Sequence, residues 1–270
     1  MEAQTPIYLP SATKKLIQRI IGTFLYYGLA LDLTMLVALG SLATQQANPT
    51  TTTWDDIVLF LNYCATNPNA TIRYASTDMI MYISSDGSYL SEPKARSRVG
   101  GIFYLSNKSN HSEHLPPLSH PFNAPFHVVA KILNIITSSA METEVAAAFH
   151  NAKDGLPFRA TLEELGHPQP PTPLELDIET AIGFLNGTMK QRHSKAIDMR
   201  FYWVKYRVAQ KQFLVYWKPG KQNIADYVSK HHAPQHHKSM RSRFFVIFLL
   251  LTSLLLNLIL HMYKPSSRKL

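Results

Sequence analysis

Hydrophobic residues follow two different periods along this chain, and the change falls near residue 70. Before it, apolar residues recur at helical spacing over residues 12–47 and again over residues 54–65. Asp32 lies within the first stretch, and a central carboxylate disfavours insertion into a membrane. Residues 1–70 are therefore predicted to form a small segment of packed helices, with residues 48–53 in a linker.

Short β-like runs begin after residue 71 and alternate with helical patterns. Five strands are predicted, over residues 79–85, 100–106, 126–136, 174–177 and 213–217. Helices are predicted over residues 140–151, 158–166, 180–185, 194–210 and 225–232. Three consecutive strands followed by alternating helices and strands favour an α/β fold. We expect a mixed five-stranded sheet with flanking helices over residues 71–238.

An uncharged apolar run, FFVIFLLLTSLLLNLIL, occupies residues 244–260. Its seventeen residues are at the lower limit for a membrane span, which needs roughly 20. Basic residues flank both ends, so positive charge indicates no orientation. Residues 239–270 are thus predicted to be a basic and apolar tail that contains an apolar C-terminal helix. Either a membrane anchor or a buried helix of a soluble protein would satisfy this pattern.

The net charge of the chain, +9 over 270 residues, favours a polyanionic partner. Nucleic acid and an anionic membrane surface both fit it. Cys64 is the single cysteine, which excludes an internal disulfide and a cysteine-rich zinc site. The first fifteen residues are polar, so no signal peptide is expected. The predicted location is the cytoplasm or nucleus, and the alternative is a tail-anchored membrane protein.

Four acidic residues lie in four separate predicted elements. Asp86 is near the end of a strand, and Glu144 is early in a helix. Asp177 ends another strand, and Asp226 lies where a loop enters a helix. A two-metal nuclease holds two divalent cations about 4 Å apart with carboxylates from different elements. Any one of these acids alone is typical of a surface or capping residue, so the prediction depends on the set.

Several long motifs around these acids resemble the ribonuclease H region of copia-type LTR retrotransposon polyproteins. They are SSDGSYLSEPKARSRVGGIFYL, SSAMETEVAAAF, LELDIETAIGFLNGTMKQRHSKAIDMRFYWVKYRVAQKQFLVYW and PGKQNIADYVSKHH. The stretches IGTFLYYGLALDLTMLVAL and FLNYCATNPNA resemble the connection segment between polymerase and ribonuclease H. The resemblance covers roughly residues 12–238 and implies a ribonuclease H-like fold. Without polymerase, protease or integrase motifs, the chain is expected to be a C-terminal fragment of such a polyprotein.

The resemblance implies hydrolysis of the RNA strand of an RNA–DNA hybrid with two Mg²⁺ ions, or with Mn²⁺ as the alternative. It assigns four metal ligands: Asp86, Glu144, Asp177 and Asp226. Glu144 matches the catalytic Glu of the family better than its neighbour Glu142. The family has Asn after the third Asp where this chain has Ile178, so contacts with nucleic acid are expected to be weaker there.

Basic residues in two segments are predicted to contact the phosphates of the hybrid without reading its sequence. They are Lys94, Arg96, Arg98, Lys190, Arg192 and Lys195. The histidines of HHAPQHH, residues 231–237, are interpreted as a solvent-exposed polar tail. A second hypothesis stays open, in which the chain is a catalytically inactive remnant that binds nucleic acid or is tethered to a membrane. The sequence does not indicate a protein partner.

Overall fold

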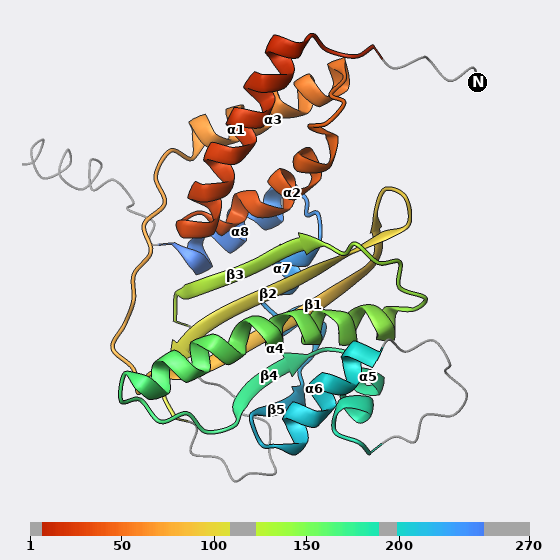
Figure 1. Cartoon of the computed structure of the whole chain (residues 1–270). Helices are drawn as coiled ribbons and strands as arrows, with labels where there is room; N and C mark the ends of the chain where they lie inside the picture. Colours follow the sequence, from red (N-terminus) through yellow and green to blue (C-terminus); the bar gives the residue numbers. More distant parts are fainter. Residues whose placement is uncertain (1–6, 109–122, 189–198, 246–270) are drawn as a thin grey trace, which may run out of the picture.

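The computed structural model of the protein describes residues 7–108, 123–188 and 199–245 (Figure 1). In these ranges the helices are α1 (Ser11–Ala30), α2 (Leu36–Gln45), α3 (Thr51–Thr66), α4 (Ala140–Glu164), α5 (Glu179–Leu185), α6 (Met199–Ala209), α7 (Asp226–Ser229) and α8 (Pro234–Phe244). Two single turns of 3-10 helix are η1 (Leu33–Met35) and η2 (Gly220–Gln222). The strands are β1 (Ile80–Glu92), β2 (Arg96–Ser106), β3 (Pro125–Ile132), β4 (Thr172–Leu176) and β5 (Phe213–Trp217).

The strands form one mixed sheet with the order β3-β2-β1-β4-β5. β1 and β3 each pair antiparallel with β2, whereas β4 is parallel to β1 and β5 is parallel to β4. The predicted mixed five-stranded sheet with flanking helices is confirmed. In the parallel pair, Ser84 lies opposite Glu175. Extending this register by two residues places Asp177 beside Asp86, which is how two distant acids meet.

Helices cover both faces of the sheet (Figure 1). α4 crosses one face, where the buried core includes Ile83, Phe103 and Ala148. α7, α8 and part of α2 cover the other face, whose core includes Tyr82 and Val228. Neighbouring residues of β1 point to opposite faces, so β1 contributes Ile83 to one core and Tyr82 to the other.

α4 is a single helix, although two helices were predicted over residues 140–151 and 158–166. Ser139 caps its first turn by accepting a hydrogen bond from the backbone N–H of Glu142. Pro157 removes one backbone hydrogen bond inside the helix. The helix nevertheless continues along the sheet. Gly155 lets it approach Ile83 closely, since a Cβ at Gly155 would lie 2.8 Å from Ile83 Cδ1.

The N-terminal helices α1, α2 and α3 have a core of their own, which includes Ile17, Leu39 and Ile57. Thr50 and Thr53 form a capping box at the start of α3, so residues expected in a linker begin a helix instead. Asp32 is fully buried, and its carboxylate accepts a hydrogen bond of 2.9 Å from Arg241 of α8. This ion pair connects the helical segment to the sheet layer, and the division of the chain at residue 70 stays a prediction.

The interpretation of residues 231–237 as a solvent-exposed tail is confirmed for His231 and His236, which are exposed, and is wrong for His232 and His237, which are half-buried. The rings of His232, His236 and His237 pack around Tyr227 of α7. α8 then runs through residue 238, where the domain was expected to end, and buries Met240 against the sheet. Histidine rings and spaced apolar residues form the face of this segment that packs on the fold. The mostly polar composition of the segment does not predict such a face.

The predicted apolar helix at residues 244–260 lies outside the described residues, except for its first two. Phe244 ends α8, and both Phe244 and Phe245 are buried in the core beneath the sheet. Among the helices of the described ranges, none is long and apolar enough to span a membrane.

Candidate metal centre

Asp86 lies in the middle of β1 and not near the end of a strand, because β1 continues to Glu92. It lies opposite Gly100 of β2. A Cβ at Gly100 would be only 2.6 Å from the carbonyl oxygen of Ala225, so the missing side chain lets α7 approach the sheet. α7 thereby brings Ser229 to Asp86, and the Ser229 hydroxyl donates a hydrogen bond to Asp86 Oδ2.

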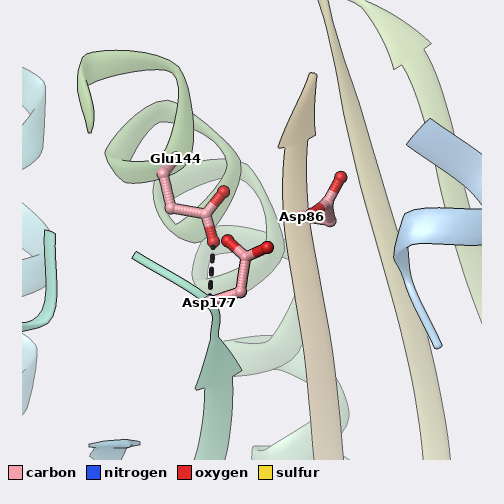
Figure 2. Close-up of side chains that lie close together, drawn as sticks. All are labelled: Asp86, Glu144 and Asp177. Atoms are coloured by element: carbon pink, nitrogen blue, oxygen red, sulfur yellow. Dashed lines mark hydrogen bonds between the residues drawn. The ribbon is translucent and has the colours of Figure 1, made fainter. Parts of the chain in front are cut away.

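Glu144 reaches the cluster from the first turns of α4. The backbone N–H of Gly87 donates to Glu144 Oε2 at 2.8 Å, and that of Asp177 donates to Oε1 at 3.4 Å (Figure 2). Gly87 permits this contact, because a Cβ there would lie 2.8 Å from the backbone of Thr143. Glu142 points elsewhere: its Oε2 accepts hydrogen bonds from the backbone N–H and hydroxyl of Ser138, both at 2.6 Å. The geometry therefore agrees with the choice of Glu144 over Glu142.

Three of the four predicted ligands converge. Asp86, Glu144 and Asp177 each offer one carboxylate oxygen, and these three atoms lie within 4.8 Å of one another. Figure 2 shows that they come from β1, α4 and the end of β4. A set of carboxylate oxygens suits a hard divalent cation such as Mg²⁺ or Mn²⁺. The residues present thus fit a divalent-metal site.

The fourth predicted ligand, Asp226, adjoins the cluster but is not part of it. Lys230, four residues later, donates a hydrogen bond to Asp226 Oδ1. The same ammonium lies 3.5 Å from Asp86 Oδ2, so Lys230 bridges the first and fourth acids. The role of Asp226 as a metal ligand stays a prediction.

Ser229 and Lys230 were not selected as site residues from the sequence. A signal for Lys230 was present, since an acid and a lysine four residues apart are neighbours on a helix. Nothing local pointed to the bond from Ser229 to Asp86, because the two residues are 143 positions apart in the chain.

The carboxylates of the cluster resist ionisation. Burial is the main cause that raises the pKa of Asp86 to about 6, and the charges of Asp226 and Asp177 add to it. Lys230 and the hydrogen bond from Ser229 act in the opposite direction. Burial, followed by the charges of Asp86 and Asp177, raises the pKa of Glu144 well above its usual value. Burial also raises the pKa of Asp177. The site therefore favours a proton or a cation.

We expect Mg²⁺ to raise the unfolding temperature more at about pH 8 than at about pH 5, because a cation must displace the proton that Asp86 holds at low pH. Without metal, the stability of the protein is expected to fall as pH rises. The pKa of Asp86 is higher in the folded chain than its ordinary value of 3.8, so its contribution to stability falls as pH rises from about 4 to about 6. The loss amounts to about 3 kcal/mol.

Thermal unfolding with and without Mg²⁺ across this pH range measures both effects. Asp55→Asn, on the exposed face of α3, is a control that removes one negative charge away from the cluster. A Mg²⁺ response that is equal at both pH values would contradict the assignment of Asp86 as a ligand.

Only part of the predicted nucleic-acid contact set is on the surface. Lys94 is exposed in the turn between β1 and β2, and Arg96 is half-buried. Arg98 is fully buried, so its assignment as a phosphate contact is wrong. Its guanidinium donates to Glu92 Oε1 at 2.9 Å and to the hydroxyl of Ser41 at 3.0 Å, which joins β2 to α2. The remaining predicted contacts lie outside the described residues: Lys190, Arg192 and Lys195.

Ile178, the departure from the family pattern, precedes the first turn of α5 and makes no side-chain cap. Its side chain packs against the core beneath α4. No polar group is therefore presented to a ligand at this position, next to Asp177.

Comparisons with known proteins find similarity to solved ribonuclease H structures. LC11-RNase H1, isolated from compost, is 15% identical over 56% of this chain and 91% of its own, with a TM-score of 0.39. Its structure in complex with an RNA/DNA hybrid matches at 14% identity over 56% and 92%, with a TM-score of 0.38. The N-terminal RNase H domain of a Mycobacterium tuberculosis protein is 14% identical over 61% and 97%, with a TM-score of 0.33. No protein-family model and no curated protein sequence matches the chain.

Proposed function

We propose that this chain is a metal-dependent nuclease of the ribonuclease H type that cleaves the RNA strand of RNA–DNA hybrids. The observation that carries the proposal is the convergence of Asp86, Glu144 and Asp177 on a mixed five-stranded sheet. The hybrid substrate and an origin in a copia-type retrotransposon polyprotein are supported by the motif resemblance around these acids.

Asp86, Glu144 and Asp177 would hold Mg²⁺, with Mn²⁺ as the alternative, and Asp226 would complete the site for a second ion. When bound, such ions activate a water molecule and stabilise the leaving 3′ oxygen. The chain itself supplies fixed positions for the acids. The backbone N–H groups of Gly87 and Asp177 orient Glu144, and Ser229 orients Asp86. Their pre-set geometry lowers the cost of organising the site during the reaction.

A cleavage assay with a labelled RNA strand tests the proposed function. We expect cleavage of the hybrid in Mg²⁺ and in Mn²⁺, and none in EDTA. Single-stranded RNA and duplex DNA should stay intact, and Asp55→Asn should cleave like the unaltered chain. Cleavage that persists in EDTA, or a hybrid left intact in both metals, would contradict the proposal.

A second candidate is a catalytically inactive remnant that still binds the hybrid. The ion pair that occupies Asp226 favours it, because Asp226 is the acid that would complete the site for a second ion. This candidate predicts binding of the hybrid without cleavage in either metal, so the same assay, combined with a binding measurement, separates the two.

We propose the cytoplasm or nucleus as the location of the protein, because hybrids are the proposed substrate. A tail anchor through residues 244–260 is the alternative. Fractionation of the tagged chain with and without these residues tests it: a membrane fraction that depends on them would support the anchor.

A further inference from the structure

A cavity adjoins the carboxylate cluster on the side of α7 and α8. It has a volume of about 310 Å³, and Lys221, Asp226 and Arg243 contribute to its lining. Gly220 lines it as well, and a Cβ there would lie 2.7 Å from Asp177 Oδ2. One wall of the cavity is therefore in contact with the candidate metal ligands, and a ligand in the cavity would continue toward them.

The lining of this cavity offers positive charge to a ligand. Lys221 and Arg243 are both exposed, and neither takes part in a hydrogen bond or ion pair with the described part of the chain. Asp226 is the acid in the lining, and Lys230 already neutralises it. The sequence of α8, PQHHKSMRSRF, contains no acidic residue. An anionic ligand therefore meets two cations that have no partner among the described residues.

A second cavity shares Arg243 with the first. It has a volume of about 240 Å³ and is lined by Arg73, Asn123 and Arg243, among others. Arg73 is exposed. Lys221, Arg243 and Arg73 thus line the two cavities, with Arg243 common to both. A series of separated cations suits a polyanion better than a single small anion.

A stack of rings forms part of the rim. His232 lies parallel to Tyr227, with ring centroids 5.4 Å apart, and His236 packs on His232 at 4.4 Å. His236 is the exposed member of this stack. An exposed ring beside cations is a feature that proteins use to hold nucleic-acid strands.

We propose that these two cavities form one site, the α8 groove (Lys221, His236, Arg243 and Arg73), which binds the sugar-phosphate backbone of a nucleic-acid strand. The inference rests on the proposed nuclease function, since the phosphodiester to be cut lies at the carboxylate cluster. Three clustered acids repel a phosphate backbone, so cations beside them must supply the binding energy. Contacts with phosphates make this binding independent of base sequence. An anionic lipid also carries phosphate. The groove begins beside Asp177 and Asp226, where the phosphodiester of a nucleic acid would be cut, so a nucleic acid is the ligand that we propose.

The test measures how tightly the full chain binds the hybrid in EDTA. Fluorescence anisotropy is the readout, and the measurement is repeated over a range of salt concentrations. We expect Lys221→Gln/Arg243→Gln to weaken binding at low salt. The slope of log affinity against log salt should fall by about 2, because each lost phosphate contact contributes about 1. Lys15→Gln/Arg19→Gln removes the same charges from the exposed face of α1 and should leave the slope unchanged. Equal slopes for the two double variants would overturn the proposal.

Two further measurements separate the groove from the nuclease activity. In Mg²⁺, the groove variant should need more hybrid for half-maximal rate but reach the same maximal rate, since it leaves the carboxylates untouched. If the unaltered chain binds the hybrid without cleaving it, the nuclease proposal fails and the groove stands. Vesicles containing an anionic phospholipid test the rival ligand. Vesicle binding lost in the groove variant, with hybrid binding retained, would overturn the groove as a nucleic-acid site.

Discussion

Asp86→Asn should lower the rate of hybrid cleavage by roughly 10³-fold while hybrid binding in EDTA is retained. Asp86 is buried between Glu144, Asp177 and Lys230, and Asn keeps its size but not its charge. A bound cation contributes several kcal/mol to stabilising the transition state. Loss of about 4 kcal/mol corresponds to the stated reduction in rate. Single-turnover cleavage in Mg²⁺ with saturating protein measures the effect on the chemical step.

The same substitution should make the metal-free protein more stable at about pH 8. Ionising Asp86 in the folded chain costs about 3 kcal/mol when its pKa rises from 3.8 to about 6. That cost is a net value, which already includes the favourable charge of Lys230. A variant that is inactive yet more stable is therefore diagnostic of a ligand site. An inactive variant that has also lost stability would point to a structural role of Asp86 instead.

Glu142→Gln is the matched control for the helix-borne ligand. Glu142 accepts its hydrogen bonds from Ser138 and lies two positions from Glu144 in the sequence. We expect this variant to cleave the hybrid at the rate of the unaltered chain, with a loss in stability of about 1 kcal/mol. Loss of cleavage here would reverse the choice between the two acids.

The sequence predicts elements best where local pattern and tertiary environment agree. β5 was predicted over residues 213–217 and is found there, because its alternating side chains match the two faces of a sheet. Asp177 was placed at the end of a strand, and it directly follows β4. By contrast, β1 extends six residues past Asp86 through a polar stretch. Pairing with β2 determines the length of β1, and no local pattern of hydrophobic and polar residues predicts it.

The candidate site, too, could be predicted from the sequence only in part. Three acids could be chosen because family-like motifs surround them, but which oxygens meet depends on glycines that allow close approach. Gly87 brings α4 to β1, and Gly100 brings α7 to β2. The position of Asp226 on a helix of four residues depends on such contacts and on Lys230. A pattern of acids in a sequence cannot reveal that a neighbouring lysine already pairs with the fourth.

Arg98→Ala should destabilise the fold by about 3–5 kcal/mol, with little change in cleavage per folded molecule. Removal of Arg98 takes the guanidinium from the buried carboxylate of Glu92 and leaves the exposed ring of His231 and the hydroxyl of Ser41 beside it. A poorly compensated buried charge is costly. The guanidinium also fills space beside α2, where a Cβ at Gly40 would lie 2.8 Å from Arg98 Nη1. Urea denaturation measures the loss in free energy of unfolding, and cleavage is compared at equal concentrations of folded protein.

Two variants decide between a structural role and a phosphate contact for Arg98. Arg98→Met/Glu92→Leu removes both charges and fills the space with apolar groups, so it should recover much of the lost stability. Arg96→Ala, two residues away and only half-buried, should change the free energy of unfolding by less than about 0.5 kcal/mol. If Arg98 contacted a phosphate, Arg98→Ala would leave stability intact and lower the salt dependence of hybrid binding by about 1. That result would restore the interpretation drawn from the sequence, whereas the buried ion pair with Glu92 predicts the opposite combination.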